Sequence, residues 1–351
     1  MDVLYLNTDM NGKRIWIILG VVVFLAVAAY VLFQVAFAPS ENPEVYRIGI
    51  LSGLEYFSEV TEGFMDGMSE LGYINGKNVA YDVQKTDFDI PKYQEMLSRF
   101  VSSKVDLVLV FPTEASQEAK QSMEGTGIPV LFAVANIEDT GLVDNVARPG
   151  GNITGVRYPG PDIALQRFEI FQDLVPDLKR VWIFYQRGYP IVRSQMNALY
   201  PVAESSGVVL EELPADNVFE VVEILNSKVV SRDTDPDAIL ILAEPLMVTP
   251  ETFTAVAEFA EEYGIPFGGA MASFGGYTSL FGVNIRPYEA GVQATDLANK
   301  ILQGAEAGNL PVVSAESFFS LNYDAVQRLG LEVDESILNR ATKIIRSDVE
   351  N

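Results

Sequence analysis

Strand-like and helix-like segments alternate from residue 45 to residue 345, and this alternation restricts the possible folds more than any other feature of the chain. Three of the strand-like runs, at 105–111, 128–134 and 238–243, are almost continuously apolar. Strands of a parallel sheet have this composition because helices cover both faces of the sheet. Between such runs, apolar residues recur at three- and four-residue steps, as they do over 57–71, which is the spacing of an amphipathic helix. The pattern predicts an α/β fold with doubly wound parallel sheets.

The alternation restarts after residue 155, so we expect two doubly wound parallel-sheet lobes of similar plan, joined by a multi-strand hinge. We place lobe 1 at 45–155 and lobe 2 at 156–284, and we expect residues 285–351 to form a C-terminal return segment that packs mainly on lobe 1. Ligands of open α/β sheets bind beyond the carboxyl ends of the strands, so two facing lobes form a cleft that closes by hinge bending. The elements expected after residue 277 are strands at 278–281 and 318–321 and helices at 287–303, 323–329 and 335–344.

An apolar segment at 15–38 precedes the lobes, and its residues 15–33 include no charged or amide side chain. As a helix it would reach about 36 Å, enough to cross a hydrocarbon core about 30 Å thick. Lys13 and Arg14 come just before it, so the positive-inside rule leaves residues 1–14 in the cytoplasm. We therefore expect one transmembrane helix at 15–38, a linker at 39–44, and a single-pass protein of the cell membrane whose C-terminal domain is extracytoplasmic.

A cleaved signal peptide is the alternative interpretation of this segment. Residues 36–38 resemble a small-residue cleavage site, but the apolar run is longer than that of a signal peptide and Pro39 disfavours cleavage. A lipid-modified N-terminal cysteine is not possible, because the chain has no cysteine.

The chain contains neither cysteine nor histidine, and this absence removes most kinds of catalytic and metal site. Disulfides, thiolate chemistry, Ser-His and Cys-His pairs and the usual zinc sites all need one of these residues. A two-carboxylate enzyme remains possible on composition, whereas the Ser-x-x-Lys motif is missing. We expect a protein that is not an enzyme and that uses no cofactor and no metal.

The formal net charge of the chain is −24, and residues 1–38 contribute none of it, because Asp2 and Asp9 balance Lys13 and Arg14. A surface this acidic repels phosphate backbones and anionic lipid headgroups. We expect no nucleic-acid partner, and we expect contact with the membrane only through residues 15–38.

The segment RPGGNITGV at 148–156 carries a resemblance to a known family. Its proline and paired glycines set a tight turn, and the residues after them re-enter a strand. The combination resembles the signature of the tryptophan/tyrosine-type substrate-binding proteins of ABC importers, which have the type I periplasmic-binding-protein fold. The sequences GIL at 49–51 and LPV at 310–312 agree with it, and the resemblance covers about residues 46–345. We interpret the segment as a hinge crossover formed by Gly150, Gly151, Asn152, Thr154 and Gly155.

The resemblance implies an extracytoplasmic solute-binding protein of an ABC importer. Such a protein would bind a small organic solute, such as an aromatic or apolar amino acid, in the interlobe cleft by hinge closure. It would then deliver this small-molecule ligand to an ABC permease and its ATPase. The alternative is a membrane-anchored ligand-sensing module that works through a partner protein.

Ligand-binding residues are expected in the loops that follow the strands. A helix N-terminus after residue 111 suits a carboxylate, and an acid at position 244 suits an ammonium group. Two structural alternatives stay open, Thr113 as a helix N-cap and Glu244 as a solvated rim carboxylate. Family members often have Thr-Pro and Asp-Pro near positions 112 and 136, and this chain departs from both, which puts the ligand specificity in doubt. The candidate ligand-binding residues are Ser52, Gly53, Tyr56, Pro112, Thr113, Ala135, Asn136, Tyr158, Tyr185, Glu244, Met271 and Asn284.

Overall fold

The structure is a computed structural model that describes residues 45–86, 89–274 and 276–346. The predicted transmembrane segment at 15–38 lies outside these residues. Among the helices that the structure describes, none combines the length and the apolar character that a membrane span requires.

The first sheet contains six strands in the order β13-β5-β4-β3-β1-β2, and every neighbouring pair is parallel. Because β3 and β4 are buried along their whole length, they have the continuous apolar sequence expected of central strands. The strands are β1 (Tyr46–Ser52), β2 (Val79–Lys85), β3 (Leu107–Phe111), β4 (Val130–Ala135), β5 (Ile153–Arg157) and β13 (Val313–Ser314).

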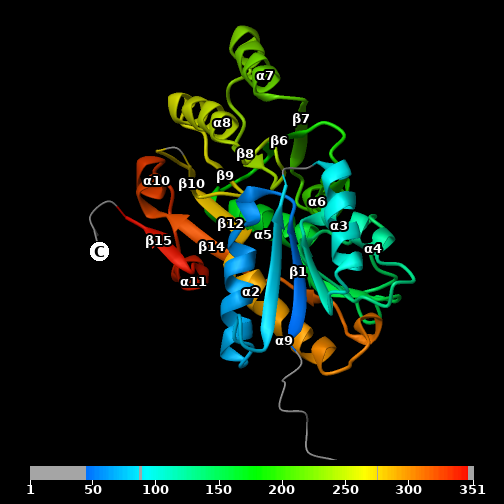
Figure 1. Ribbon diagram of the computed structural model, residues 1–351. Coiled ribbons are helices and arrows are strands. Elements are labelled where there is room, and N and C mark those ends of the chain that lie inside the picture. Colours follow the sequence, from blue (N-terminus) through cyan, green and yellow to red (C-terminus); the bar gives the residue numbers. More distant parts are fainter. Residues whose placement is uncertain (1–44, 87–88, 275, 347–351) are drawn as a thin grey trace, which may run out of the picture. The chain divides into compact units, whose positions relative to one another are not determined.

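Helices cover both faces of this sheet (Figure 1). Alternate residues of β3 point to opposite faces, so Leu107 and Leu109 pack with α2 and α9, whereas Val108 and Val110 pack with α3 and α4. A single short helical turn, η1 (Glu55–Phe57), follows β1. The helices are α2 (Glu59–Glu70), α3 (Ile90–Ser102), α4 (Thr113–Ser122) and α9 (Pro287–Leu302).

Glycines allow α2 and α9 to pack closely although they are far apart in the sequence (Figure 1). A Cβ atom on Gly63 would lie 2.0 Å from the carbonyl oxygen of Tyr288, and one on Gly291 would lie 2.2 Å from that of Val60. The backbones can approach to this extent only where neither helix carries a side chain.

The second sheet contains seven strands in the order β15-β14-β12-β9-β8-β6-β7, with α5 and α6 on one face and α7 and α8 on the other. Two short strands, β10 (Ser273–Phe274) and β11 (Tyr277–Thr278), form a separate hairpin. The strands are β6 (Arg180–Gln186), β7 (Val209–Ala215), β8 (Ala238–Ile241), β9 (Phe267–Gly269), β12 (Phe281–Ile285), β14 (Ser317–Asn322) and β15 (Lys343–Ile345). The helices of this half are α5 (Gly160–Leu174), α6 (Pro190–Ser205), α7 (Val218–Ser231), α8 (Pro250–Tyr263), α10 (Tyr323–Arg328) and α11 (Glu335–Arg340).

The second sheet departs from the predicted all-parallel arrangement, because β14 pairs with β12 in the antiparallel direction. The predicted strand at 278–281 begins only at Phe281. The predicted helix at 335–344 ends at Arg340, and the chain then pairs as β15 with β14. The backbone N–H and the hydroxyl of Thr342 both donate to the carbonyl of Phe319, which fixes the extended chain against the sheet edge.

The C-terminal residues are divided between the two sheets. The helix α9 packs on α2, and after the single turn η2 (Ala307–Asn309) β13 joins the first sheet beside β5. The last two strands, β14 and β15, belong to the second sheet. The expectation that residues 285–351 pack mainly on lobe 1 is therefore met only by the part before β14.

The chain passes between the two sheets three times, after β5, after β12 and after β13. The segment 148–156 lies before the first of these crossovers. Thr154 and Gly155 belong to β5, and Gly150, Gly151 and Asn152 form the turn that precedes it. The residues predicted for the hinge are thus in the first sheet, and the crossover itself follows Arg157.

Local packing explains why this segment has its unusual sequence. Gly150 and Gly151 have φ angles of 79° and 55°, which favour glycine. A Cβ atom on Gly155 would lie 2.1 Å from the carbonyl oxygen of Phe132 on the neighbouring strand. The segment is a turn followed by a tightly packed strand. Its glycines are required by the turn and by this packing, and none of them lies at a crossover between the sheets.

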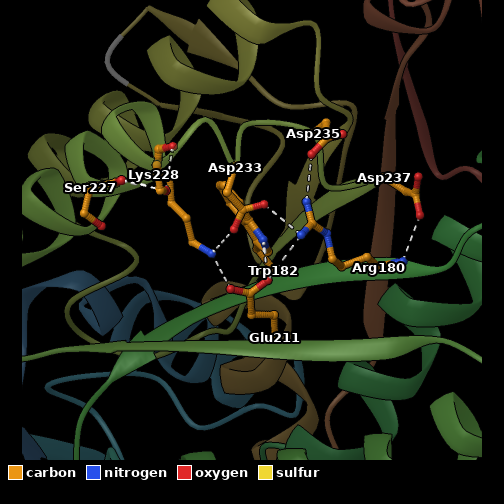
Figure 2. Close-up of polar contacts among 9 residues, drawn as sticks. Arg180, Trp182, Glu211, Ser227, Lys228, Asp233, Asp235 and Asp237 are labelled. Atoms are coloured by element: carbon orange, nitrogen blue, oxygen red, sulfur yellow. Dashed lines mark hydrogen bonds and ion pairs between the residues drawn. The ribbon is translucent and has the colours of Figure 1, made fainter.

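A network of charged side chains joins the start of β6 to β7 and α7 in the second sheet (Figure 2). The Nζ atom of Lys228 contacts the carboxylates of Glu211 and Asp233 and lies 4.5 Å from the ring centre of Trp182. Arg180 reaches Asp233 at 2.7 Å. The network lies at the amino end of β6, whereas the cavity described next lies at the carboxyl ends of the strands.

Candidate binding cavity

A cavity of about 80 Å³ lies where the loops after the first-sheet strands meet the loops after the second-sheet strands. The first sheet contributes residues that follow β1, β3, β4 and β5, and the second contributes residues that follow β6, β8 and β12. Both sheets therefore present the carboxyl ends of parallel strands to the cavity, which is where open α/β sheets bind ligands.

The structure brings most of the predicted binding residues together around this cavity. They lie at or just after the ends of six different strands, β1, β3, β4, β5, β8 and β12, so only the tertiary fold makes them neighbours. Those that line the cavity are Tyr56, Pro112, Thr113, Asn136, Tyr158, Glu244 and Asn284.

Three predicted residues of the first sheet do not line the cavity. Ser52 is buried at the end of β1, where its hydroxyl donates to the carbonyl of Leu54. Gly53 lies against the loop after β3, and a Cβ atom there would lie 2.6 Å from the hydroxyl of Tyr93. Ala135 is fully buried within β4.

Two predicted residues of the second sheet also lie elsewhere. The hydroxyl of Tyr185 is directed to Glu212 on β7 and donates a hydrogen bond to its carboxylate. Met271 precedes the β10–β11 hairpin, where its carbonyl accepts a hydrogen bond from the hydroxyl of Ser279. The rule that binding residues follow strand ends therefore failed here, because Tyr185 lies within β6 and bonds to the neighbouring strand, and Met271 packs against the core cluster that includes α8.

Several residues that line the cavity are not among the twelve predicted binding residues. Phe57 is one of them, and it makes an edge-to-face contact with Tyr56 at 5.0 Å between ring centres. One signal was available for part of this set, since Tyr189 directly precedes the proline that opens α6, and Pro245 and Pro287 themselves open a turn and the helix α9. The omitted residues are Leu54, Phe57, Glu114, Val134, Tyr189, Ile191, Ala243, Pro245, Val248, Ile285 and Pro287.

Glu244 is a buried carboxylate in the wall of the cavity, with 3% of its surface exposed. It accepts backbone N–H hydrogen bonds from Gln186 at 3.0 Å, Leu246 at 2.8 Å and Met247 at 3.2 Å. Burial raises the pKa of Glu244 to about 7, and the three hydrogen bonds only partly oppose this effect. The interpretation of Glu244 as a solvated rim carboxylate is therefore wrong.

Thr113 does not serve as the N-cap of α4, because it is the first residue of that helix and Pro112 occupies the cap position. Its Oγ1 atom instead accepts hydrogen bonds from Asn136, at 3.0 Å from the backbone nitrogen and at 3.4 Å from Nδ2. Thr113 thus joins the loop after β3 to the loop after β4 and fixes the position of Asn136 in the cavity wall.

A hydrogen bond crosses the cavity between elements of the two sheets. The hydroxyl of Tyr189, which precedes α6, donates to Oε1 of Glu114 in the first turn of α4 at 2.9 Å. Burial, and after it the charge of Glu114, raises the pKa of the Tyr189 hydroxyl far above its usual range. Tyr189 therefore stays protonated and acts as a donor at any physiological pH.

The wall of the cavity has the composition of a site that binds a small molecule. Within the described residues, no three carboxylates converge on a point where a metal ion would lie. The wall combines aromatic rings, such as those of Tyr56, Phe57 and Tyr158, with a few polar groups. This composition is typical of a site that recognises a small organic ligand.

Comparison with known proteins agrees with this geometry. Residues 49–345 match the family described as ABC transporter substrate binding protein. A tyrosine-binding protein of Clostridioides difficile (strain R20291) is 26% identical over 300 residues, which are 84% of this chain and 83% of that protein.

Solved structures share the fold. An ABC domain from Streptococcus pneumonia in complex with L-Trp superposes with a TM-score of 0.71 at 24% identity and covers 86% of this chain and 100% of its own. The ligand-free, open structure of a substrate binding protein from Clostridium difficile gives a TM-score of 0.69 at 24% identity, with 86% and 99% covered.

Proposed function

The chain belongs to the family of ABC transporter substrate binding proteins, and from this premise we propose that it captures an amino acid, with an aromatic or apolar side chain as the expected class, for import. Proteins of this family bind ligands and are not enzymes. The proposed partners are an ABC permease and its ATPase. The match to the family over most of the chain favours transport over a sensing module.

The observation that carries the proposal is the cavity at the carboxyl ends of both sheets. Its aromatic and apolar walls suit a hydrophobic side chain, and the amino end of α4 together with Glu244 suits the two charged groups of an amino acid. A tyrosine-binding relative and an L-Trp complex of the same fold support this class of ligand.

Lobe 1 at 45–155 and lobe 2 at 156–284 are proposed as two lobes that close over the ligand. The three crossovers supply the hinge, and ligand binding would shift an existing equilibrium toward the closed form. Residues 15–38 are proposed as a transmembrane anchor that keeps the binding lobes extracytoplasmic and close to the permease.

A thermal-shift panel of the standard amino acids on the full-length protein in detergent micelles tests the ligand class. At a hundredfold excess over Kd, binding adds about 2.7 kcal/mol to the free energy of unfolding, which raises the melting temperature measurably. Stabilisation by tryptophan, tyrosine or another large apolar amino acid is the expected result. No response to any amino acid, together with a response to ribose or another neutral solute, would contradict the amino-acid class and leave the transport role intact.

A further inference from the structure

Arg167 on α5 is a fully buried cation next to residues that line the cavity. Buried arginines are usually paired with a carboxylate, because removing an ionised group from water is costly. Within the described residues, the hydrogen bonds of Arg167 all go to uncharged oxygens, and no aspartate or glutamate forms an ion pair with it. The reason for an arginine at this position must therefore lie in the groups that its guanidinium holds.

The first of these groups is the end of β12. The Nε and Nη2 atoms of Arg167 donate to the carbonyl oxygen of Val283 at 2.9 and 2.6 Å. Because β12 pairs with β9 only as far as Gly282, the guanidinium supplies a donor to this buried carbonyl beyond the end of the neighbouring strand. It thereby fixes the chain directly before Asn284 and Ile285, which line the cavity.

The second group is the hydroxyl of Tyr158, to which Nη2 of Arg167 also donates, at 3.3 Å. Tyr158 is the first residue after β5, and its side chain lines the cavity with 5% of its surface exposed. One guanidinium therefore holds a residue of the first crossover and a residue that lies shortly before the second crossover, at Val283.

This pair of contacts requires the planar fork of an arginine. A guanidinium presents five N–H donors in a fixed plane, whereas a lysine ammonium is a compact charge on a flexible stem. The Nη1 atom of Arg167 is buried and has no partner within the part of the chain that the structure describes. An apolar side chain of similar volume would avoid both the buried charge and this unpaired donor, so packing alone does not account for the arginine.

We propose that Arg167 is a positioning residue of the binding site, which fixes Tyr158 and the end of β12 in the cavity wall by joining the chain at two of its three crossovers. The inference rests on the proposed binding function and extends it to a residue that is not among those lining the cavity. Arg167 and Val283 are 116 positions apart in the sequence, so no local structure keeps these parts of the wall together. A ligand between them binds best when the wall is already in place.

The variant Arg167→Lys tests this role. It keeps the positive charge but cannot make the same set of hydrogen bonds, so the wall should loosen. Calorimetric titration of the full-length protein in micelles should show affinity for L-tryptophan reduced about tenfold. Hydrogen exchange of the ligand-free protein, followed by mass spectrometry, should be about tenfold faster in peptides that cover 158–160 and 283–286.

Arg180→Lys is the matched control. It makes the same substitution at the amino end of β6, where the guanidinium binds Asp233 and Asp235 away from the cavity. It should leave the affinity within about twofold of the parent and the exchange of 158–160 and 283–286 unchanged. Urea unfolding of both variants separates a general loss of stability from a loss of positioning.

Tyr158→Phe provides a second variant with little risk to the fold, because it keeps the ring and removes only the oxygen that Arg167 holds. Exchange of the peptide that covers 158–160 should become about threefold faster. Since both substitutions remove the same contact, the double variant with Arg167→Lys should lose affinity about threefold less than the product of the two single losses.

Two results would overturn the positioning role: affinity and local exchange of Arg167→Lys that match those of Arg180→Lys, or single losses that multiply fully in the double variant. If Arg167→Lys does not fold, unchanged exchange at 158–160 in Tyr158→Phe overturns it. A parent that does not bind L-tryptophan, combined with faster exchange at 158–160 and 283–286 in Arg167→Lys, would contradict the proposed ligand class and uphold the positioning role.

Discussion

At the scale of single residues, burial decides the chemistry of the cavity. Glu244 is almost inaccessible, and removal from water outweighs three hydrogen bonds in setting its protonation. Its pKa in the fold lies above the value of about 4.3 expected when the chain is unfolded. Ionisation of Glu244 therefore lowers the free energy of unfolding of the ligand-free protein. The contribution of neutral Glu244 to stability is fully present below the pKa of the unfolded chain and is lost as the pH rises through about 7.

The pH dependence of binding follows from the same shift. An ammonium ligand favours charged Glu244, so affinity should rise about tenfold between pH 6 and pH 8 and level off above that range. Calorimetric titration with L-tryptophan across this range measures the effect. Glu244→Gln should remove this dependence of affinity on pH. If the affinity of the parent protein does not change with pH, Glu244 does not face the amine.

At the scale of secondary-structure elements, close contacts between backbones restrict which residues are tolerated. The helices α2 and α9 are far apart in the sequence and pack against each other at glycines, where no side chain separates the two backbones. The network around Lys228 is the polar counterpart, since it links β6, β7 and α7 through charges that are only partly exposed (Figure 2).

Gly291→Ala tests the helix contact. The new methyl group would meet the backbone oxygen of Val60, which cannot rotate away, so we expect a loss of about 1–3 kcal/mol in the free energy of unfolding. Asp296→Ala, at an exposed position of the same helix, should change it by about 0.5 kcal/mol or less. Urea unfolding measures both variants, and equal stabilities would show that α2 and α9 can separate without cost.

Lys228→Met tests the charged network. It removes the ammonium group that Glu211 and Asp233 share and leaves Arg180 as their remaining cation. We expect a loss of about 1–2 kcal/mol at pH 7, less than for a fully buried pair because both carboxylates are partly exposed. Lys228 and Arg180 lower the pKa of Asp233, so this contribution is present above about pH 4 and is lost as the pH falls. Urea unfolding at pH 7 and pH 3 should therefore show a difference that shrinks at the lower pH. A difference that is independent of pH would point to lost packing on Trp182.

At the scale of the whole described unit, binding depends on how the two sheets come together. The crossovers allow a hinge, and the hydrogen bond between Tyr189 and Glu114 joins elements of the two sheets beside the cavity. In the proposed hinge mechanism this bond would favour the closed arrangement, and its loss should shift the equilibrium toward the open one.

Tyr189→Phe measures that contribution. A hydrogen bond to a charged group contributes about 1.5–3 kcal/mol, so affinity for the ligand should fall about tenfold or more. Tyr200→Phe is the matched control, because it removes a tyrosine–glutamate hydrogen bond to Glu212 at a site outside the cavity. Calorimetric affinity and small-angle scattering of the ligand-free protein check both. An affinity of Tyr189→Phe equal to that of Tyr200→Phe would contradict a role in closure.

Some of the fold and the site was predictable because it depends on local composition. Buried strands such as β3 and β4 are apolar throughout, and amphipathic spacing identified helices such as α2 and α9. Position after a strand end led to Glu244 and Asn136. The same rule also selected Tyr185 and Met271, which the structure places within β6 and against a core cluster, because the end of a strand cannot be located from the sequence to within one or two residues.

The sequence alone determined the alternating α/β architecture, the family resemblance and the absence of histidine and cysteine chemistry, since each follows from residue type and spacing along the chain. The tertiary structure alone decided the division of the C-terminal residues between two sheets and the pairing of Tyr189 with Glu114. It also decided that one oxygen each of Glu114 and Asn136 is buried without a partner among the described residues. The physical reason is that strand pairing, burial and hydrogen bonding join residues that are distant in the chain. Those contacts arise only when both sheets have formed.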